Sequence, residues 1–367
     1  MAPEVEVQLI AVIVAAACAL PGVFLVLRRM AMLSDAISHT VLLGIVLGYL
    51  LTRDLGSPLL FVGAVAMGVV TVALVELVTG TGLVREDAAI GLVFPVLFSI
   101  AVILISRFAG NVHLDVDSVL LGELVFAPFD RVRLLGLDLP RALLVGLVTL
   151  LANLLLIGLF YKELKLATFD AGLAAALGFA PALVHYGLMT MVSITAVGAF
   201  DAVGSILVIA LMVAPPAAAY LLTDRLARML LLSVLIGAAS AIAGYWLAYW
   251  LDVSVAGAMA TLSGVAFGLC YLFAPGRGLV AGAARRARQR WEFAQQMLAL
   301  HLLNHEGTAE AIEECSPSRL SAHLRWPPAF AAEVVRRAEQ GGLVQRRGEL
   351  LKLTERGRRL AQEASLR

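Results

Sequence analysis

The stretch Leu9–Leu27 reads LIAVIVAAACALPGVFLVL and contains no charged side chain. An α-helix needs about 20 consecutive apolar residues to cross the hydrocarbon core of a bilayer, and this stretch has that length. It lacks the preceding basic segment of a cleaved signal peptide, so we interpret it as a first membrane helix. The fold of this chain is therefore expected to be built in lipid.

The same apolar pattern recurs along most of the chain. Of the 367 residues, 60% are hydrophobic and 15% are charged, whereas soluble domains carry roughly 25% charged residues. After Ala274 the charged residues become frequent, which divides the chain into a membrane domain at 1–275, a basic juxtamembrane linker at 276–289 and a soluble domain at 290–367. We predict an all-α polytopic membrane protein with nine spans, at 9–27, 36–52, 57–79, 88–106, 141–161, 184–200, 202–222, 228–250 and 254–274.

The orientation follows from the basic residues between the spans, because cytoplasmic connections carry an excess of Lys and Arg. With the N-terminus outside, twelve basic residues lie on the cytoplasmic side and five on the outer side. We therefore expect a bacterial cytoplasmic-membrane protein with an outer N-terminus and a cytoplasmic C-terminal domain. The inner set is Arg28, Arg29, Arg85, Lys162, Lys165, Arg225, Arg228, Arg277, Arg285, Arg286, Arg288 and Arg290, and the outer set is Arg53, Arg107, Arg131, Arg133 and Arg141.

The three cysteines are Cys18, Cys270 and Cys315. Their wide separation predicts neither a disulfide framework nor a Cys-x-x-Cys metal site. We interpret them as small packing residues.

Ionisable side chains inside a span are costly and mark functional pathways. We treat Asp201 as a candidate pathway residue. Most of the others lie near the ends of their spans, where water or headgroups can solvate them, and we interpret them as structural. These are Glu76, Glu86, Asp87, His185 and Asp252.

Asp35 and His39 form the clearest candidate site. Four residues separate them, so both side chains lie on one face of a helix. A carboxylate with an imidazole is a ligand set that manganese, zinc or iron(II) accepts. Two protein ligands make a weak site, and weak binding suits a transport pathway because the ion must leave again. The alternative is a buried hydrogen-bonded pair that only ties two helices together.

Two connections are too long to be simple turns. The first runs from Phe108 to Pro140 on the outer side, and Val116–Phe126 is apolar with the period of a short interfacial helix where an external protein could dock. The second runs from Lys162 to Pro181 on the cytoplasmic side. Its small residues follow a cap at Thr168 or Asp170 and predict a short helix that is ended by Gly178 and Pro181. Such a helix could be bound by another protein.

These motifs resemble the permease subunits of the metal-type ATP-binding-cassette importers, which carry manganese, zinc or iron(II). The resemblance covers nearly all of 9–274 and rests on several separate segments in the same order. The segments are Arg28–Met30 with Ser34–His39, Arg85–Gly91, Leu120–Leu124, Lys162–Asp170 and Gly204–Thr223.

The resemblance implies a homodimer of permeases, each bound to a cytoplasmic ATPase, and an extracytoplasmic metal-binding protein that delivers the cargo. It assigns Asp35 and His39 to metal contact in the central pathway. It also implies that Asp170–Gly178 is a coupling helix whose close-packing face is Ala174, Ala175 and Gly178. The mechanism would be alternating access driven by the ATPase. Manganese is the favoured cargo, with zinc or iron(II) as alternatives.

The chain itself is not expected to be an enzyme. No Gly-rich phosphate loop followed by Lys and Ser or Thr stands in the sequence, so ATP would be bound by the partner subunit only. No permanently bound cofactor is expected, and the transported metal is the one ion implied.

The C-terminal domain reads as helix, helix, helix, two-stranded ribbon and helix, the order of a winged helix-turn-helix. The predicted elements are Arg290–His305, Ser316–Leu324, a helix from Pro327-Pro328 to Gly341-Gly342, a ribbon at Leu343–Thr354 turning at Gly348, and a last helix from Thr354. The ending Leu353-Thr-Glu-Arg-Gly357 resembles the N-terminal domain of repressors of the diphtheria-toxin-repressor type.

The function of this domain stays open at the level of sequence. From Gly276 to Arg367 there are sixteen Arg and Lys against ten Glu, a net charge of +6, which favours an anionic surface such as DNA or the inner leaflet. We prefer a regulatory or protein-contact module, since a membrane-tethered copy meets little of the chromosome. The candidate contacts are Arg336, Arg337, Arg346 and Arg347, and His301, His305 and Glu306 could chelate metal but read more simply as solvent-exposed.

Two other functions are weighed against the importer. One is a membrane-anchored, metal-responsive transcription regulator. The other is a secondary transporter or channel that needs no ATPase, which the coupling-like helix at Asp170–Gly178 disfavours.

Overall fold

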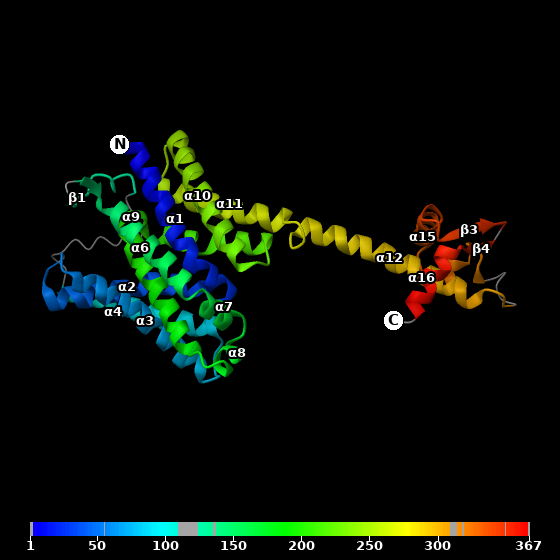
Figure 1. Ribbon diagram of the computed structural model, residues 1–367, viewed down its shortest axis with the longest axis horizontal. Helices are drawn as coiled ribbons and strands as arrows, with labels where there is room; N and C mark the ends of the chain where they lie inside the picture. Colours follow the sequence, from blue (N-terminus) through cyan, green and yellow to red (C-terminus); the bar gives the residue numbers. More distant parts are fainter. Residues whose placement is uncertain are drawn as a thin grey trace. The chain divides into compact units, whose positions relative to one another are not determined.

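The computed structural model describes residues 3–54, 56–108, 124–134, 137–308, 314–317, 319–348 and 350–365. The chain divides into two compact units, Met1–Arg277 and Gly278–Arg367. We call them the membrane unit and the C-terminal unit, and we describe each by itself (Figure 1).

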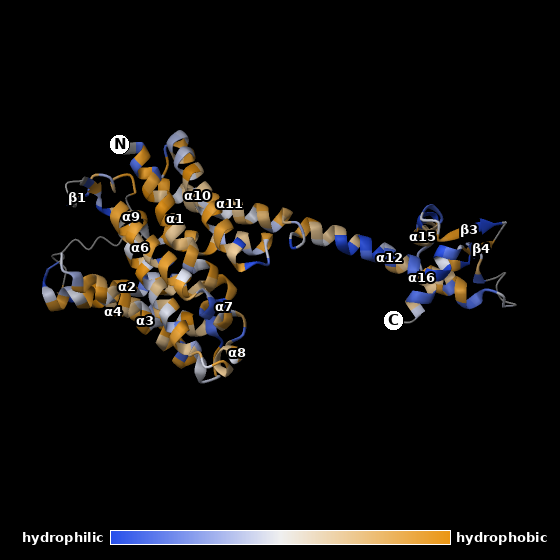
Figure 2. Cartoon of the chain, viewed as in Figure 1, coloured by the Kyte–Doolittle hydropathy of each residue, from blue (hydrophilic) through white to orange (hydrophobic). Residues whose placement is uncertain are grey.

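The membrane unit is a bundle of long apolar helices (Figure 2). Within the described residues, nine stretches are long and apolar enough to cross a membrane, since α9 holds two of them, Pro181–Phe200 and Ala202–Leu222. This confirms the nine predicted spans, although α2 begins at Ala31 and not at 36. The helices are α1 (Pro3–Leu27), α2 (Ala31–Thr52), α3 (Pro58–Gly80), α4 (Glu86–Phe108), α6 (Arg141–Leu159), α9 (Pro181–Leu222), α10 (Leu226–Leu251) and α11 (Val255–Phe273).

Helix α9 is interrupted at Gly204, whose backbone is non-helical, with φ 75° and ψ 163°. A positive φ is easily adopted by glycine because it has no Cβ. The predicted sixth and seventh spans therefore meet at a break in one helical element, without an intervening loop.

Helix α1 forms the centre of the membrane unit and packs against α6, α9 and α10. Its side chains are buried along most of its length. Close backbone approach holds another pair, α2 and α3, where a Cβ placed on Gly44 would lie 2.1 Å from the carbonyl oxygen of Gly63. Small residues at helix contacts allow this approach, which is the main source of packing energy between helices in lipid.

Buried polar side chains in the bundle find partners on neighbouring helices. The Asn153 amide in α6 donates to the Ala17 carbonyl and to Thr195 Oγ1, both at 2.9 Å. The Thr71 hydroxyl in α3 donates to Thr40 Oγ1 in α2 at 2.7 Å. These bonds remove the cost of an unpaired polar group in an apolar interior and fix which helices are neighbours.

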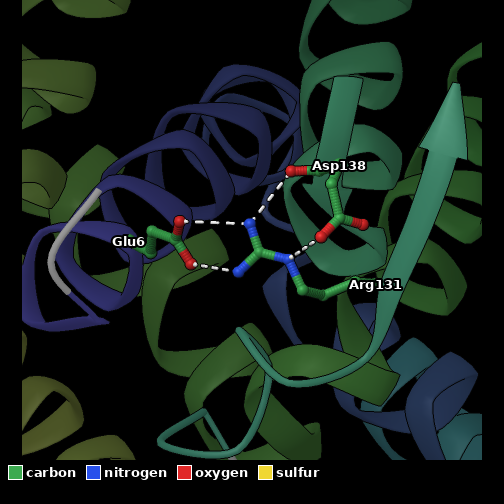
Figure 3. Close-up of polar contacts among 3 residues, drawn as sticks. All are labelled: Glu6, Arg131 and Asp138. Atoms are coloured by element: carbon green, nitrogen blue, oxygen red, sulfur yellow. Dashed lines mark hydrogen bonds and ion pairs between the residues drawn. The ribbon is translucent and has the colours of Figure 1, made fainter. Parts of the chain in front are cut away.

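A β-hairpin forms the last part of the long outer connection, where no strand is predicted from the sequence. Strand β1 (Arg131–Leu134) pairs antiparallel with β2 (Leu137–Pro140). Arg131 lies 3.2 Å from the buried Glu6 carboxylate in α1 and 3.1 Å from Asp138 in β2, and so ties the hairpin to the start of the bundle (Figure 3). Most of the predicted interfacial helix, Val116–Phe126, lies outside the described residues.

In its described residues the C-terminal unit contains a long helix, two further helices, a two-stranded ribbon and a last helix. Glycine at 348 has φ 65° and lies between the strands, as predicted. Most of the predicted linker at 276–289 is helical, because the helix through His305 begins at Leu279, and its role as a linker stays a prediction. The helix predicted at Ser316–Leu324 is shorter. The elements are α12 (Leu279–His305), α14 (Leu320–His323), α15 (Pro328–Gln340), β3 (Val344–Arg347), β4 (Leu350–Leu353) and α16 (Glu355–Ser365).

The core of this unit is a single apolar cluster that includes Leu298, Leu302, Leu320 and Val334. Cys315 is buried in the same cluster, and burial raises the pKa of its thiol. All three cysteines are free, in agreement with their interpretation as packing residues. The element order agrees with the winged-helix prediction, which stays a prediction.

Candidate functional site

Asp35 and His39 lie one turn apart on α2, and their side chains meet. His39 Nε2 is 3.4 Å from Asp35 Oδ1, and the two side chains are 29% and 37% exposed, respectively. Both belong to the same helix and keep partial access to the surroundings of the chain. They therefore do not form the buried tie between two helices that was the alternative interpretation.

Aromatic rings from α4 position the imidazole of His39. Phe94 stacks on it at 5.7 Å between ring centroids, and Phe98 meets it edge-on at 5.9 Å. The neighbouring Ser34 and Ser38 hydroxyls donate to carbonyl oxygens of their own helix. The apolar walls hold the ring while leaving the carboxylate–imidazole pair as the polar feature of this surface.

An exposed apolar side chain, Met32, lies on the same face of α2 as the pair, because it is three residues before Asp35 and seven before His39. One carboxylate oxygen and one imidazole nitrogen can ligate a divalent transition metal, and the remaining coordination positions are open for water or further ligands. Such a site binds and releases its ion easily.

A second polar cluster joins residues that the sequence leaves apart, and we call it the Arg28 network. His185 Nε2 in α9 lies 2.7 Å from Glu76 Oε1 in α3. The Tyr186 hydroxyl donates to the other Glu76 oxygen at 2.6 Å. Arg28, between α1 and α2, lies 3.2 Å from His185 Nδ1. Because Arg can only donate, Nδ1 accepts, and the imidazole proton is at Nε2 facing Glu76.

Glu76 and His185 were interpreted as solvated helix ends, so the structure assigns them a contact that sequence reasoning missed. The sequence contains one indication of this contact. Arg28, Glu76 and His185 all lie at ends of predicted spans that face the same side of the membrane. The network also reaches the short helices after α6, because Arg28 Nε donates to Thr168 Oγ1 at 3.2 Å. Thr168 belongs to α7 (Tyr161–Phe169).

A short helix, α8 (Ala171–Ala176), lies in the segment for which a coupling helix is predicted, and its coupling role stays a prediction. Asp170 is its N-cap, and its carboxylate accepts from the Leu173 N–H at 2.8 Å. Of the predicted close-packing face, Ala175 and Gly178 are exposed, but Ala174 is completely buried within the chain. The prediction for Ala174 is therefore wrong, since a six-residue helix lying on the bundle must turn one side inward.

Large apolar side chains surround this short helix at the surface. Leu173 and Leu177 are exposed, and so are Phe169 before the helix and Phe179 after it. We call these four side chains, with Ala175 and Gly178, the α8 face. A cluster of exposed apolar side chains next to charged ones is typical of a protein contact surface.

Asp201 lies in α9, three residues before the break at Gly204. Its side chain lies outside what the structure describes, so its assignment to the pathway stays a prediction.

The four candidate arginines of the C-terminal unit have mixed surroundings. Arg336 and Arg337 both pair with Glu333, at 2.6 and 2.7 Å. Their hydrogen bonds hold the pKa of that carboxyl below its ordinary value. Arg337 also lies over the Trp291 ring, and Arg346 is 3.8 Å from Glu339. Arg347 is exposed. Three of the four arginines thus have a carboxylate partner, although Arg336 and Arg337 share one.

Known proteins resemble this chain over most or all of its length. It is 53% identical to the zinc transport system membrane protein TroD of Treponema pallidum, over 97% of both chains. It is 49% identical to the manganese transport system membrane protein MntD of Bacillus subtilis, over 77% of this chain and 95% of the relative.

A solved structure with the same fold is PsaBC from Streptococcus pneumoniae in complex with Fab. It has a TM-score of 0.63 and 27% identity, over 76% of this chain and 94% of that chain. The model of the ABC 3 transport family matches residues 5–274, which is nearly the whole membrane unit. With nine candidate spans and these relatives, the chain is a multi-pass membrane protein that belongs to the ABC 3 transport family.

Proposed function

We propose that this chain is the membrane permease of an ATP-driven importer for a divalent transition metal, with manganese and zinc as the first candidates. The observation that carries the proposal is the Asp35–His39 pair, a weak two-ligand metal set on a partly exposed face of a spanning helix. Relatives named for zinc and for manganese transport, at 53% and 49% identity, support the same class of cargo.

The exposure of the pair supports a homodimer. A carboxylate and an imidazole facing lipid would be costly. The same face turned toward a second copy would place two carboxylates and two imidazoles around a shared pathway, so that each copy supplies half of the ligands. The exposed Met32 on the same face would then belong to the contact between the copies.

The α8 face supports a separate ATPase as partner. Its exposed Leu173, Leu177 and Phe169 offer an apolar surface of the kind that protein contacts bury. The Arg28 network links α7, next to this face, to α3 and α9. A displacement of α8 by the ATPase would be passed through Arg28 to two spanning helices, which is what alternating access requires.

The remaining partners and the orientation rest on the basic-residue pattern. With the N-terminus outside, the β-hairpin and Arg131 lie on the outer side, where an extracytoplasmic metal-binding protein would dock. The C-terminal unit is then cytoplasmic. We infer a winged-helix fold for it from its element order. The local pairing of Arg336, Arg337 and Arg346 with glutamates favours a regulatory or protein contact over DNA.

The test is metal uptake by proteoliposomes that contain this chain, its ATPase and its binding protein. Radioactive manganese and zinc should accumulate only with ATP, and Asp35→Ala should abolish the uptake while the complex still assembles. Asp252→Asn is the matched control, since Asp252 is an exposed residue at the end of α10 and asparagine tolerates its φ of 52°. Uptake that continues without ATP, or unchanged uptake in Asp35→Ala, would overturn the proposal.

A further inference from the structure

Three histidines and one glutamate meet in the C-terminal unit. His301 and His305 lie one turn apart on α12, and Glu314 and His323 come from the following segment and from α14. Glu314 Oε2 is 3.0 Å from His323 Nδ1 and 3.5 Å from His301 Nε2. Ligand atoms of His301, His305 and Glu314 all lie within 4.8 Å of one another. Residues distant in sequence thus converge on one carboxylate oxygen.

The spacing of these atoms matches what a transition metal needs. In a tetrahedral zinc site with zinc–nitrogen distances of about 2.0–2.1 Å, neighbouring ligand atoms lie roughly 3.3 Å apart. The two distances at Glu314 Oε2 bracket this value. The rings of His301 and His305 are 4.8 Å apart, so a rotation of the His305 side chain brings its nitrogen into the same shell.

The cluster is more enclosed than an ordinary surface group of histidines. The His301 and Glu314 side chains are only 12% and 18% exposed, whereas His323 is 33% exposed and offers an entry path. The Glu314 carboxylate already has a close partner in His323. His301 Nε2 lies 3.0 Å from the backbone carbonyl oxygen of Glu314 as well, a contact that it would exchange for a metal. Three imidazoles within reach of one carboxylate make up a ligand set for a transition metal.

Glu306, which the sequence suggests as a ligand beside His301 and His305, has another role. Its carboxylate oxygens are 2.8 and 3.0 Å from an Arg358 nitrogen in α16. Glu306 is thus held by Arg358, and Glu314 is the carboxylate that lies beside His301 and His305.

We propose that His301, His305, Glu314 and His323 form a binding site for a divalent transition metal, with a preference for zinc over manganese. Three imidazoles and one carboxylate suit zinc, and nitrogen-rich sites bind zinc more tightly than manganese. Because the ligands come from α12, α14 and the segment between them, a bound ion fastens these elements together. The site is separate from Asp35 and His39 and does not depend on transport.

The experiment uses the full-length chain in lipid nanodiscs, stripped of metal and titrated with Zn²⁺ against a chromophoric chelator. Asp35→Ala with His39→Ala serves as the background, so that the membrane pair does not contribute. This background should bind one Zn²⁺ per chain. Adding His301→Ala and His305→Ala should weaken that binding by at least about 100-fold, since losing even an outer-shell partner of a metal ligand costs roughly 10–100-fold.

Two further variants separate ligation from folding. Glu314→Gln keeps the size of the side chain and an acceptor oxygen for His323, so the unit should fold while Zn²⁺ binding weakens. Glu306→Gln removes a carboxylate next to His305 that is paired with Arg358, and its zinc affinity should equal that of the background. X-ray absorption at the zinc edge should show a nitrogen and oxygen shell with imidazole scattering.

The proposal is overturned if the background chain binds no Zn²⁺. It is also overturned if the variant with His301→Ala and His305→Ala binds Zn²⁺ as tightly as the background does. Equal weakening by Glu314→Gln and Glu306→Gln would count against it too, because general loss of negative charge would then explain the effect.

Discussion

The membrane unit and the C-terminal unit both place two potential metal ligands one helical turn apart, at Asp35 and His39 and at His301 and His305. In the membrane unit, both side chains stay partly exposed, and the apolar rings of Phe94 and Phe98 line the imidazole. In the C-terminal unit, Glu314 and His323 close in on the helical pair. If both proposals hold, the number of converging elements is what distinguishes the proposed transport site from the proposed binding site of the C-terminal unit.

The match to the transport family ends near the boundary between the two units. The family model matches residues 5–274, all within the membrane unit. The match to TroD covers 97% of both chains and must include most of the C-terminal unit. The C-terminal unit therefore lies outside the family model but within the similarity to TroD.

The largest expected effect sets the two units against each other in transport. Asp35→Ala combined with His39→Ala should reduce metal uptake to background, whereas ending the chain after Arg277 should leave most of it, because the match to the transport family, residues 5–274, lies within the membrane unit. The measurement is initial uptake in reconstituted vesicles with equal amounts of assembled complex. If truncation abolishes uptake in complexes that still assemble, the C-terminal unit takes part in transport. That result would contradict the view that the membrane unit alone carries it out.

The second-largest effect is expected from a substitution in the α8 face. Leu177→Asp puts a charge on an exposed apolar surface and should weaken ATPase binding by about 10-fold or more, as loss of an interface contact worth about 1.4 kcal/mol does. Binding of purified ATPase to the chain in nanodiscs measures this. Lys165→Gln, an exposed change on α7, is the control. Equal binding by Leu177→Asp and Lys165→Gln would remove the α8 face as the docking surface.

Ala174→Leu tests the corrected role of its residue on the same helix. Because Ala174 is buried, the larger side chain should overpack its surroundings and lower the stability of the membrane unit by about 1–3 kcal/mol. Thermal unfolding in detergent should show the loss. An unchanged melting temperature together with weakened ATPase binding would restore the original prediction that Ala174 faces the partner.

Glu76→Gln should act through the Arg28 network. It removes the negative partner of His185 and the charged acceptor of Tyr186, and the expected cost is about 1–2 kcal/mol, less than for a fully buried pair because the Glu76 side chain is 40% exposed. Thermal unfolding measures this cost, with Asp87→Asn, an exposed carboxylate on α4, as control. An equal effect of both changes would argue against a specific network.

The smallest effect concerns the surface of the C-terminal unit. Hydrogen bonds from Arg336 and Arg337 lower the pKa of Glu333, so their stabilising contribution is complete above the ordinary value of 4.5 and is lost as the pH falls through the lowered pKa. Glu333→Gln should therefore lower the melting temperature slightly at neutral pH, and the difference from the parent should vanish in stronger acid. A difference that persists there would contradict the ion-pair explanation.

The sequence predicts features that depend on neighbouring residues. Hydropathy over about 20 residues locates the nine spans, and helical spacing alone brings Asp35 to His39. Asp170 as a helix cap and the turn at Gly348 are equally local. Each of these could be predicted because the interaction is made within one element or one turn.

The missed features all depend on which distant segments become neighbours. Arg28 meets His185 only because the end of α1 lies beside the start of α9, and Glu314 meets His323 only after the C-terminal unit folds. The burial of Ala174 depends on the side of α8 that lies against the bundle. The hairpin at Arg131 has four-residue strands, too short for hydropathy alternation to stand out.

The break at Gly204 has a consequence for the sidedness of the chain. A straight helix of the 42 residues of α9 would be about 63 Å long, roughly twice the thickness of the hydrocarbon core. If α9 passed through once, the chain would cross the membrane an even number of times and both ends would share one compartment. Nine predicted crossings require the two halves of α9 to cross separately, and the non-helical backbone at Gly204 supplies the break between them.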